Sequence, residues 1–414
     1  MNKELVVVGL GYIGLPTAVV LAESGWQVTG VDVSDRTIEY VQAGRLPFVE
    51  EGLEVALKSA VESGKLTAQK ETPHADVYII SVPTPFKGDH EADLSYIDDA
   101  TDAIIPHLVG NELLVLESTS PAGTTEHMAK RVFAARPDLS LDGSEGRPIV
   151  HFAHAPERVL PGRIMIEMRA NDRIVGGLTE EATKLAFDVY DSFCEGTVFT
   201  TDATTAELSK LTENSFRDVN IAFANELSLI CDDLGVDVWE LIELANKHPR
   251  VNILNPGPGV GGHCIAVDPW FIVSADRKNS KLINQARLVN DGKPEWVMDK
   301  MKSKLDGDFE GKTIALLGLA FKPNIDDLRE SPAMNIAIRV AGDNPNAKVL
   351  VVEPNVPEMP AKLAGFANME FASADDAIAR ADLVVLLVSH DVFKGLRPSV
   401  PADTAILDTT GLWR

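Results

Sequence analysis

Cysteine is scarce in this chain of 414 residues, which holds only Cys194, Cys231 and Cys264. None of the three stands in a CxxC pattern and no HxxxH pattern accompanies them, so the spacings typical of metal sites are missing and we expect no metal. So few cysteines, without a targeting segment, favour reduced thiols and a cytoplasmic location.

Basic residues are scarce too, since 38 Lys and Arg stand against 62 Asp and Glu and the formal net charge is −24. Nucleic acids and acidic membranes both need a basic protein surface, so we expect neither as a partner. The acidity fits an ordinary acidic cytosolic enzyme better than a protein from a saline host, although both explanations stay open.

Long apolar runs are absent as well. The start of the chain, MNKELVVVGLGYIG, has a short apolar run broken by glycine, which is typical of a buried strand rather than of a signal peptide or a membrane span. No repeat or low-complexity segment stands out. The length favours two or three domains, and 45% apolar with 24% charged residues is typical of a globular protein.

What the chain does have is a glycine fingerprint. A strand is predicted over residues 4–8, followed by Gly9, Gly11 and Gly14, a helix, and a second strand that ends at Asp32. The first glycine makes a tight turn, the second admits a pyrophosphate and the third lets the helix pack on the strand. A carboxylate at Asp32 would accept ribose hydroxyls and repel a 2′-phosphate, so the pattern predicts NAD rather than NADP.

Three further strands are predicted in the first half of the chain, at residues 75–83, 112–119 and 148–158. In an open parallel sheet, ligands bind at the carboxyl ends of the strands. We therefore expect Thr84, Thr119 and Glu157 to point into the cofactor crevice. The alternative is that these polar side chains only cap loops.

A long amphipathic pattern predicts a helix over residues 204–234 that stops at Gly235. Lys210, Asn214 and Arg217 stand at i, i+4 and i+7, so they share one face of this helix. Such a face is usually just solvated, but three polar residues, two of them basic, in a base-poor chain favour a site.

The stretch Arg250–Trp270, RVNILNPGPGVGGHCIAVDPW, is so rich in glycine and proline that we expect neither helix nor strand there. It holds Cys264, with Asp268 four residues on. Its glycines let the backbone approach a ligand closely, as the presentation of a nucleophile requires. Taken alone, the stretch fits a surface loop with an incidental thiol better, and only the rest of the chain favours a nucleophile.

From Gly311 onward the alternation of strands and helices restarts, which predicts a second doubly wound domain. Its turn at residues 318–322 lacks the full dinucleotide fingerprint and predicts a different phosphate ligand, with Lys322 and Arg329 as cations. The predicted fold is thus α/β, with two doubly wound, Rossmann-like domains joined by a helical segment with a long central helix.

A cysteine beside a nicotinamide suggests a specific chemistry. The thiol traps an aldehyde as a thiohemiacetal, loss of hydride gives a thioester, and water releases an acid. Lys210 or Asp268 could serve as the base or as an electrostatic partner of the thiol.

Several long motifs resemble the UDP-glucose/GDP-mannose dehydrogenase family over essentially the whole chain: GLGYIGLPTA, LTENSFRDVNIAFANELSLI, GGHCIAVDPW and FKPNIDDLRESPA. Others are most similar to members that oxidise UDP-N-acetyl-D-mannosamine: VPTPFKGDHE, ESTSPAGTTE, PERVLPG, NKHPRVNILNPGPGVGGHC and the C-terminal GLWR. Sister enzymes take UDP-N-acetylglucosamine, UDP-glucose or GDP-mannose. The resemblance implies a four-electron oxidation at C6, from alcohol through aldehyde to uronate, with two NAD reduced.

The resemblance also implies three parts: an NAD-binding domain over 1–200, a helical dimerisation and catalytic segment over 201–300, and a UDP-sugar-binding domain over 301–414. The positions that match catalytic residues are Cys264, Lys210, Asn214, Asp268, Glu157 and Thr119. Among them Cys264 matches the thiol nucleophile and Lys210 a general acid/base or oxyanion stabiliser.

Together with the fingerprint Gly9, Gly11 and Gly14, the positions that match NAD contacts are Tyr12, Ile13, Asp32, Thr84, Thr119 and Arg329. The positions that match contacts to the nucleotide-sugar substrate are Arg158, Val159, Lys210, Asn214, Arg217, His248, Arg250, Gly261, Phe321, Lys322 and Arg414. The family further implies a homodimer built on the long helix, in which Arg250 reaches the partner subunit's active site.

Two other classes stay open. A 3-hydroxyacid or 6-phosphogluconate-type dehydrogenase would form one NADH and need neither the thiol nor the second α/β domain. A non-catalytic sensor of NAD or of nucleotide sugars would need no nucleophile.

Overall fold

The computed structural model describes residues 4–48, 50–160, 162–262 and 264–414. The chain forms two compact units, residues 1–213 and 214–414. The predicted division into 1–200, 201–300 and 301–414 stays a prediction.

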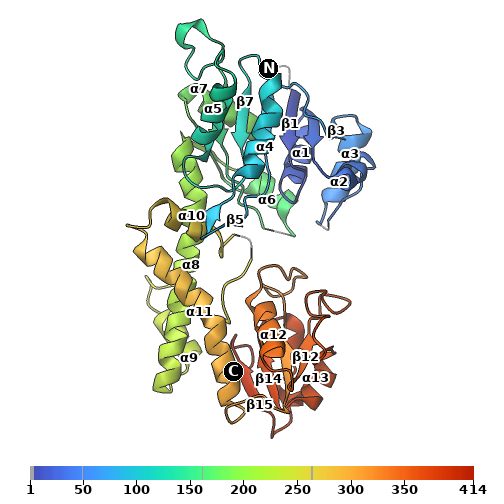
Figure 1. Ribbon diagram of the computed structural model, residues 1–414, viewed down its shortest axis with the longest axis vertical. Coiled ribbons are helices and arrows are strands. Elements are labelled where there is room, and N and C mark those ends of the chain that lie inside the picture. Colours follow the sequence, from blue (N-terminus) through green and yellow to red (C-terminus); the bar gives the residue numbers. More distant parts are fainter. Residues whose placement is uncertain (1–3, 49, 161, 263) are drawn as a thin grey trace. The chain divides into compact units, whose positions relative to one another are not determined.

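The first unit is built on a sheet of eight strands in the order β10-β9-β8-β7-β4-β1-β2-β3 (Figure 1). These strands are β1 (Glu4–Val8), β2 (Gln27–Val31), β3 (Leu66–Gln69), β4 (Val77–Ile80), β7 (Leu113–Leu116), β8 (His151–His154), β9 (Arg173–Gly177) and β10 (Val198–Asp202). A small hairpin joins β5 (Phe86–Lys87) to β6 (Glu91–Ala92). Strand β1 pairs in parallel with β2 on one side and β4 on the other. The strand order therefore reverses at β1, which is where doubly wound sheets bind ligands.

One edge of this sheet differs from the expectation of a parallel sheet. Strand β9 pairs antiparallel with β8, and β10 follows β9 in parallel. The sequence did not predict these two strands. The chain leaves β8 at its carboxyl end and enters β9 from the same edge of the sheet, so β9 runs opposite to β8. No crossover is needed for such a return.

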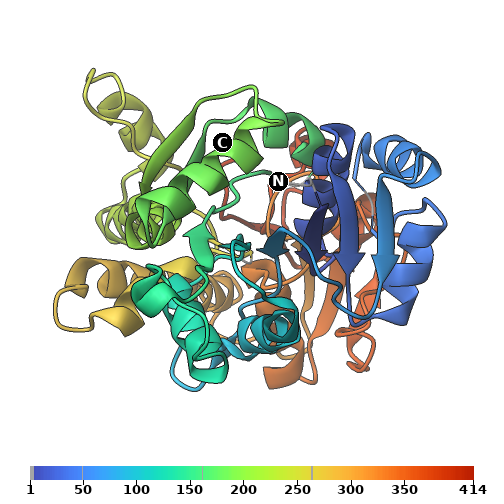
Figure 2. The same cartoon turned by 90° about the horizontal axis from the view of Figure 1, so that it is seen from above.

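Helices cover both faces of the sheet: α1 (Gly14–Glu23), α2 (Asp35–Gln42), α3 (Leu53–Glu62), α4 (Ser95–Ile104), α5 (Thr124–Ala135), α6 (Ile164–Ala170) and α7 (Glu180–Asp191). Alternate residues of β1 show why. Leu5 and Val7 enter a core with α1, α3 and α7, whereas Val6 and Val8 enter a core with α4 and α5. Figure 2 shows helices on both faces of this sheet. A strand with two buried faces reads as a continuous apolar run, which is what ELVVV shows.

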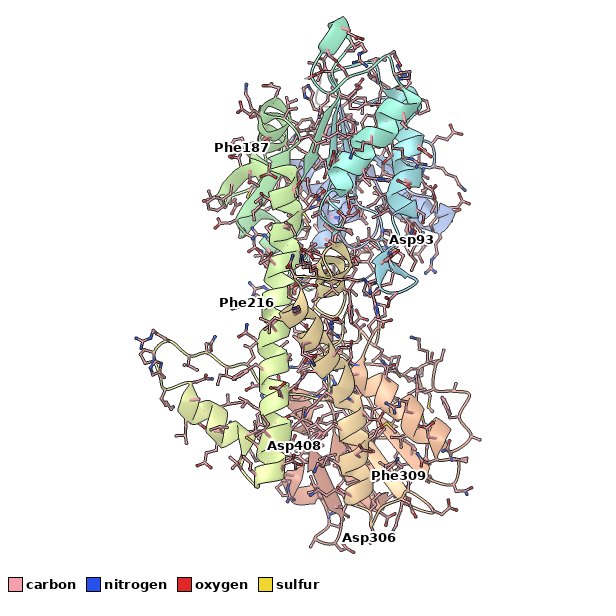
Figure 3. All side chains as sticks on the ribbon, turned by 60° about the vertical axis from the view of Figure 1, so that its left-hand side comes forward. Asp93, Phe187, Phe216, Asp306, Phe309 and Asp408 are labelled. Atoms are coloured by element: carbon pink, nitrogen blue, oxygen red, sulfur yellow. The ribbon has the colours of Figure 1, made fainter. Side chains whose placement is uncertain are left out.

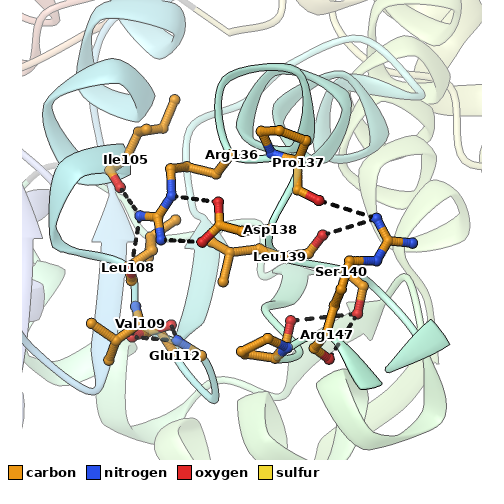
Figure 4. Close-up of polar contacts among 12 residues, drawn as sticks. Ile105, Leu108, Val109, Glu112, Arg136, Pro137, Asp138, Leu139, Ser140 and Arg147 are labelled. Atoms are coloured by element: carbon orange, nitrogen blue, oxygen red, sulfur yellow. Dashed lines mark hydrogen bonds and ion pairs between the residues drawn. The ribbon is translucent and has the colours of Figure 1, made fainter. Parts of the chain in front are cut away.

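A polar cluster closes the amino end of β7 (Figure 4). The Arg136 guanidinium donates to the carbonyl of Leu108 at 2.8 Å and pairs with Asp138 at 2.6 Å. Glu112 accepts the backbone N–H of Val109 at 2.6 Å. These charges hold the loop before β7, at the edge of the sheet opposite the predicted cofactor crevice.

The long helix α8 (Ala203–Leu234) continues from one unit into the other. It begins where the Asp202 carboxylate accepts the Thr205 N–H at 2.9 Å, an N-cap. It ends at Gly235, whose φ of +67° suits a residue without a side chain. The predicted helix over 204–234 with a stop at Gly235 is confirmed.

Three more helices open the second unit: α9 (Val238–Ala245), α10 (Asp268–Ala275) and α11 (Lys281–Ser303). The expectation that residues 250–270 hold no helix was wrong at its end, because α10 begins at Asp268. Pro269 stands in the first turn of α10, where its missing N–H removes no helical hydrogen bond. The rest of the stretch, apart from residue 263, which lies outside the described residues, has no regular structure.

A second sheet in the order β13-β12-β11-β14-β15 is parallel throughout. Its elements are β11 (Thr313–Leu317), α12 (Pro332–Asp343), β12 (Lys348–Val352), β13 (Met369–Phe371), α13 (Ala374–Arg380), β14 (Leu383–Leu386) and β15 (Ala405–Asp408). Ile314 and Leu316 face a core with α11 and α12, while Ala315 and Leu317 face a core with α13. The predicted second doubly wound domain is confirmed, although β13 and α13 were not anticipated.

None of the helices in the described part of the chain combines the length and the apolar character that crossing a membrane requires.

Candidate functional site

The glycine fingerprint forms the turn between β1 and α1. Gly9 has φ +95°, and a Cβ there would lie 2.2 Å from the carbonyl oxygen of Ser81. A Cβ on Gly14 would lie 1.9 Å from the carbonyl oxygen of Gly9. At Gly11, by contrast, a Cβ would meet nothing within 4 Å. Packing therefore requires the first and third glycines, and the second leaves space beside the backbone, as a pyrophosphate site needs.

Asp32 is held against this turn. One carboxylate oxygen accepts the N–H of Leu10 at 2.9 Å, and the other accepts the N–H of Ser34 at 2.8 Å. Helix α1 starts directly after Ile13 and carries no acidic residue in its first turn. Its free N–H groups and the helix dipole therefore favour a bound phosphate.

Tyr12 flanks the same turn. Its ring packs against Phe48 with centroids 4.7 Å apart, and its hydroxyl donates to the buried carboxylate of Glu50 at 3.3 Å. Glu50 also accepts the N–H of Ile164 at 2.8 Å, at the start of α6. The residue predicted to contact NAD is thus anchored to α6 as well as to the glycine turn.

The loops that follow β4 and β7 are joined to each other. The Thr84 hydroxyl donates to the carbonyl oxygen of Thr119 at 2.5 Å, and the Ser118 hydroxyl accepts the N–H of Val82 at 2.9 Å. Thr84 and Thr119, which were both placed at strand ends from the sequence, therefore lie together at the carboxyl edge of the sheet.

Glu157, the third residue placed there, lies largely below the surface. Its side chain is 7% exposed and pairs with Arg173 at 2.7 Å. Its other oxygen accepts the N–H of Arg158 at 2.7 Å. A role at the nicotinamide stays a prediction.

Glu117 was missed from the sequence. It lies at the end of β7 and accepts hydrogen bonds from the hydroxyls of Thr17, at 3.0 Å, and Tyr190, at 3.1 Å. Burial and the nearby charge of Glu157 raise the pKa of Glu117 to about 7, although Arg173 acts in the opposite direction. A charged residue inside the apolar run ELLVLEST was the available signal.

Arg158 and Val159, both predicted to contact substrate, follow Glu157. The guanidinium of Arg158 pairs with Glu213 of α8 at 2.7 Å, and Val159 packs against the core of the first unit. Lys210 is half-buried on α8, one turn before Glu213.

Glu207 of α8 was also not predicted from the sequence. It is buried and accepts the N–H of Gly123 at 2.5 Å and both the N–H and the hydroxyl of Thr125, at 2.7 and 2.6 Å. Its carboxylate therefore caps α5 and fixes the loop that carries Thr119. Nothing in a helical pattern distinguishes such a residue from a solvated one.

In the second unit, the structure brings together three predicted catalytic residues. The Asn214 amide donates to the Asp268 carboxylate at 2.5 Å, and the Asp268 N–H donates to the carbonyl oxygen of Cys264 at 2.8 Å. Asp268 is 2% exposed, whereas Cys264 is exposed. A surface thiol thus stands one turn before a buried carboxylate that α8 holds in place.

The loop before Cys264 rests on the predicted substrate residue Phe321. A Cβ on Gly261 would lie 3.0 Å from the Cβ of Phe321, and one on Gly262 would lie 3.1 Å from its ring. The N–H of Gly262 also donates to the carbonyl oxygen of Glu330 at 3.3 Å. Gly261 and Phe321, far apart in sequence, therefore meet, and only glycines allow this approach.

The remaining predicted contacts lie at the surface of the second unit. Arg217, His248, Arg250, Lys322 and Arg414 are exposed. The His248 Nδ1 accepts the N–H of Arg250 at 3.3 Å. Arg329 forms a bidentate pair with Asp327, at 2.9 and 2.7 Å. Their predicted roles stay predictions.

The turn after β11 has the same backbone conformation at its first glycine as the turn after β1. Gly318 has φ +91°, and its N–H donates to the end of β12 at 2.8 Å, just as the N–H of Gly9 donates to the end of β2 at 2.8 Å. However, α12 starts only at Pro332, whereas α1 starts at Gly14. The intervening loop carries Phe321 and Lys322, so this turn differs from a dinucleotide site, as the sequence predicted.

Among the described residues, no group of three or more His, Cys, Asp or Glu side chains is arranged to hold a metal ion.

Models of one family match three consecutive parts of the chain. They are the NAD binding domain of the UDP-glucose/GDP-mannose dehydrogenase family over residues 3–194, its central domain over 204–292 and its UDP binding domain over 315–414. The chain belongs to the UDP-glucose/GDP-mannose dehydrogenase family. It is therefore an NAD-dependent nucleotide-sugar dehydrogenase, and the predictions of an enzyme, of NAD and of this fold class are confirmed.

Relatives within the family are similar over their whole length. A UDP-N-acetyl-D-mannosamine dehydrogenase from Yersinia pestis is 50% identical and covers 100% of this chain and 99% of its own. An NDP-N-acetyl-D-galactosaminuronic acid dehydrogenase from Ralstonia nicotianae is also 50% identical, covering 99% and 96%. A solved UDP-D-ManNAc dehydrogenase from Pyrococcus horikoshii is 36% identical with a TM-score of 0.86, covering 99% and 96%.

Proposed function

We propose that this enzyme oxidises UDP-N-acetyl-D-mannosamine at C6 to the uronate, in two steps that reduce two NAD, through a thioester on Cys264. The observation that carries the proposal is the Asn214–Asp268–Cys264 arrangement, in which a buried carboxylate bonded to an amide stands one helical turn after an exposed cysteine. A dehydrogenase that stops at the aldehyde needs no such nucleophile.

NAD accepts a hydride from the substrate carbon in each oxidation. In the first, the C6 hydroxyl loses its proton to a base while the hydride leaves, and an aldehyde results. The Cys264 sulfur then adds to the aldehyde carbon and gives a thiohemiacetal. Loss of the second hydride gives a thioester, and attack by water breaks the carbon–sulfur bond and returns the thiol with the free acid.

The residues of the chain have separate tasks in this scheme. We assign Lys210 the role of acid/base or oxyanion stabiliser, and Asn214 with Asp268 the positioning of thiol and water. Thr119 and Glu157 line the nicotinamide side.

The identity of the sugar is the least constrained part. The Y. pestis and R. nicotianae relatives are equally identical to this chain, yet their names differ in the sugar. Oxidation of an N-acetylgalactosamine nucleotide is therefore the second candidate, ahead of UDP-N-acetylglucosamine and UDP-glucose.

We also propose a homodimer built on α8. Large apolar side chains stand exposed at Phe216, Phe223, Ile230 and Leu234. Their spacing of seven, seven and four residues places them along one face of the helix. Figure 3 labels the first of them, Phe216, on α8. Phe216 is 71% and Leu234 72% exposed, which an isolated monomer rarely sustains in a continuous stripe. In this dimer Arg250 reaches the partner's active site, and the enzyme works in the cytoplasm, where NAD and nucleotide sugars are available.

The test is the number of NADH formed per UDP-sugar consumed, with UDP-N-acetylmannosamine, UDP-N-acetylgalactosamine, UDP-N-acetylglucosamine and UDP-glucose in separate reactions. Two NADH with the first sugar alone supports the proposal. Two NADH with another sugar support the thioester step but assign that sugar nucleotide as the substrate. One NADH per sugar in the wild type refutes the thioester step.

Variants of cysteine sharpen this test. Cys264→Ser should bind NAD and UDP-sugar normally but fail to turn over to the acid. Cys194→Ser is the matched control, because that half-buried thiol donates to backbone carbonyls and packs on the core of the first unit. Full activity in Cys264→Ser would exclude Cys264 as the nucleophile. A wild type that binds both ligands but is inactive would point to a sensor.

A further inference from the structure

The second Rossmann-like domain holds a buried carboxylate at the place where the first holds Asp32. Glu353 directly follows β12, as Asp32 follows β2. One Glu353 oxygen accepts the N–H groups of Leu319, at 2.8 Å, and Ala320, at 3.0 Å, just as Asp32 accepts that of Leu10. The Glu353 side chain, however, is 0% exposed. The carboxylate that would reach a ribose in a dinucleotide fold is thus enclosed by its own turn.

The partner that encloses it is His390, beyond the end of β14. Its Nε2 lies 3.1 Å from Glu353, and its Nδ1 lies 2.9 Å from the backbone nitrogen of Asn324. A backbone N–H can only donate, so Nδ1 is the acceptor and Nε2 carries the proton that His390 donates to Glu353. The geometry therefore settles the tautomer of this imidazole.

Asn324 is held at further points. It has φ +61°, a conformation that asparagine tolerates better than most residues. Its side chain donates to the Asp391 carboxylate at 3.0 Å and accepts the Asp391 N–H at 2.9 Å. Glu353 and His390 together thus hold both ends of the loop over residues 319–324, which carries Phe321 and Lys322.

The loop in turn supports the thiol segment, because the ring of Phe321 lies against Gly262. Burial acts to raise the pKa of Glu353, but hydrogen bonds from His390 and Leu319 outweigh it and lower the pKa below its ordinary value. The carboxylate is therefore ionised at neutral pH and accepts from every N–H that faces it. Asn355 supplies two more donors, at 3.1 and 3.0 Å.

We propose that Glu353 and His390 form a positioning pair that presets the loop over residues 319–324 to bind the uridine diphosphate part of the substrate. Neither residue touches the substrate, because both are enclosed; they act through Phe321 and Lys322. The inference rests on the proposed function, and on the match of this domain to a UDP binding domain. A preset loop lowers the ordering cost of binding, so its loss should weaken nucleotide affinity rather than the chemical steps.

The experiment measures the Kd of UDP by calorimetry on the full-length protein, with NADH affinity by fluorescence and KM and kcat for the UDP-sugar beside it. Glu353→Gln keeps the shape but turns an NH₂ group toward N–H donors. His390→Leu removes the hydrogen bonds of the imidazole with Glu353, Asn324 and Asn355. Each should raise the Kd of UDP and the KM by about tenfold or more, with kcat and NADH affinity within about threefold of the wild type.

Two comparisons separate positioning from general damage. His390→Gln can still donate to Glu353 and accept from Asn324, so it should bind UDP within about threefold of the wild type. Val392→Ala changes a side chain that is 60% exposed two residues from His390 and should leave all values unchanged. If His390→Leu proves too unstable to assay, Glu353→Gln carries the test alone, because it disturbs the acceptor of the Leu319 and Ala320 N–H groups and leaves the imidazole in place.

Normal UDP affinity in a folded His390→Leu or Glu353→Gln variant overturns the pair, as does an equal loss in His390→Leu and His390→Gln. A fall in kcat with unchanged KM and UDP affinity also overturns it. A wild type that binds neither UDP nor a UDP-sugar refutes the proposed function and this inference together, whereas the other outcomes refute the inference alone.

Discussion

The buried carboxyl of Glu117 should make the stability of the first unit depend on pH in an unusual direction. Glu117 and Glu157 share one guanidinium, that of Arg173, and the ion pair at 2.7 Å belongs to Glu157. Burial raises the pKa of Glu117 from its ordinary 4.5 to about 7. In the native state Glu117 therefore keeps its proton up to about pH 7, whereas the unfolded chain releases it near pH 4.5.

The sign follows from proton linkage. Between these two pKa values the native state binds more protons than the unfolded state, so the free energy of unfolding falls as pH rises. The slope is about 1.4 kcal/mol per pH unit, so the contribution of Glu117 to the free energy of unfolding falls by ~2.5 kcal/mol between about pH 5 and pH 8. Glu370, whose hydrogen bond from Arg380 lowers its pKa to about 2, titrates well below this window.

Glu117→Gln removes the titration and keeps the shape. Thr17 and Tyr190 bond to Glu117 through hydroxyls, which can donate to the amide oxygen or accept from its NH₂. The stability of Glu117→Gln relative to the wild type should therefore rise by ~2.5 kcal/mol from about pH 5 to pH 8. Urea unfolding at each pH, followed by circular dichroism, gives this difference.

The matched control is Glu112→Gln, at the other end of β7. Both oxygens of Glu112 face backbone N–H groups, which cannot reverse, so this change should destabilise the protein by about 1–3 kcal/mol with no comparable gain toward high pH. The reasoning about Glu117 is refuted if the wild type and Glu117→Gln keep parallel stability curves from about pH 5 to pH 8.

Four other perturbations have defined outcomes. Gly14→Ala should unfold the first unit, because its Cβ would lie 1.9 Å from a backbone oxygen. Gly11→Ala should keep the melting temperature of the wild type but lower the affinity for NAD at least ~10-fold. Equal effects of the two variants in calorimetry and in NAD titration would contradict this. Burial lowers the pKa of Lys293 to about 7. Lys293→Met should therefore stabilise the protein by ~2–4 kcal/mol near pH 6, and this gain should vanish toward pH 10. If urea unfolding shows the same difference between variant and wild type at every pH, the assignment is contradicted. Asp268→Asn should lower kcat by ~10² with little change in UDP affinity, and near-normal kcat would remove its role. Phe223→Asp should yield monomers in light scattering, and an unchanged dimer would exclude the α8 stripe.

Much of the fold was predictable because it depends on local pattern. The turn at Gly9 with Asp32, the helix that stops at Gly235 and the second domain from Gly311 each follow from periodicity and turn chemistry. Strands β9 and β10 were not predicted, and their direction depends on where a connection re-enters the sheet. The start of α10 was missed because proline was taken as a helix breaker, whereas at Pro269 it occupies the first turn.

The candidate site was likewise predictable only for some of its residues. Cys264, Asn214 and Asp268 stood out by residue type and motif, and the fold brings them together. Glu117 and Glu207 did not stand out, because a glutamate on a helix or at a strand end is usually solvated. Their burial and their partners depend on segments far away in the chain.

By itself, the sequence determined the family, the cofactor and the residue types of the site, since these depend on short motifs whose physical reasons are local. Only the tertiary structure decided that Gly261 meets Phe321, that Asp268 is buried against Asn214 and that Glu353 faces His390 rather than a ribose. Each of these pairs joins segments distant in the chain. Their meeting is set by how whole helices and sheets pack, and no local pattern encodes that packing.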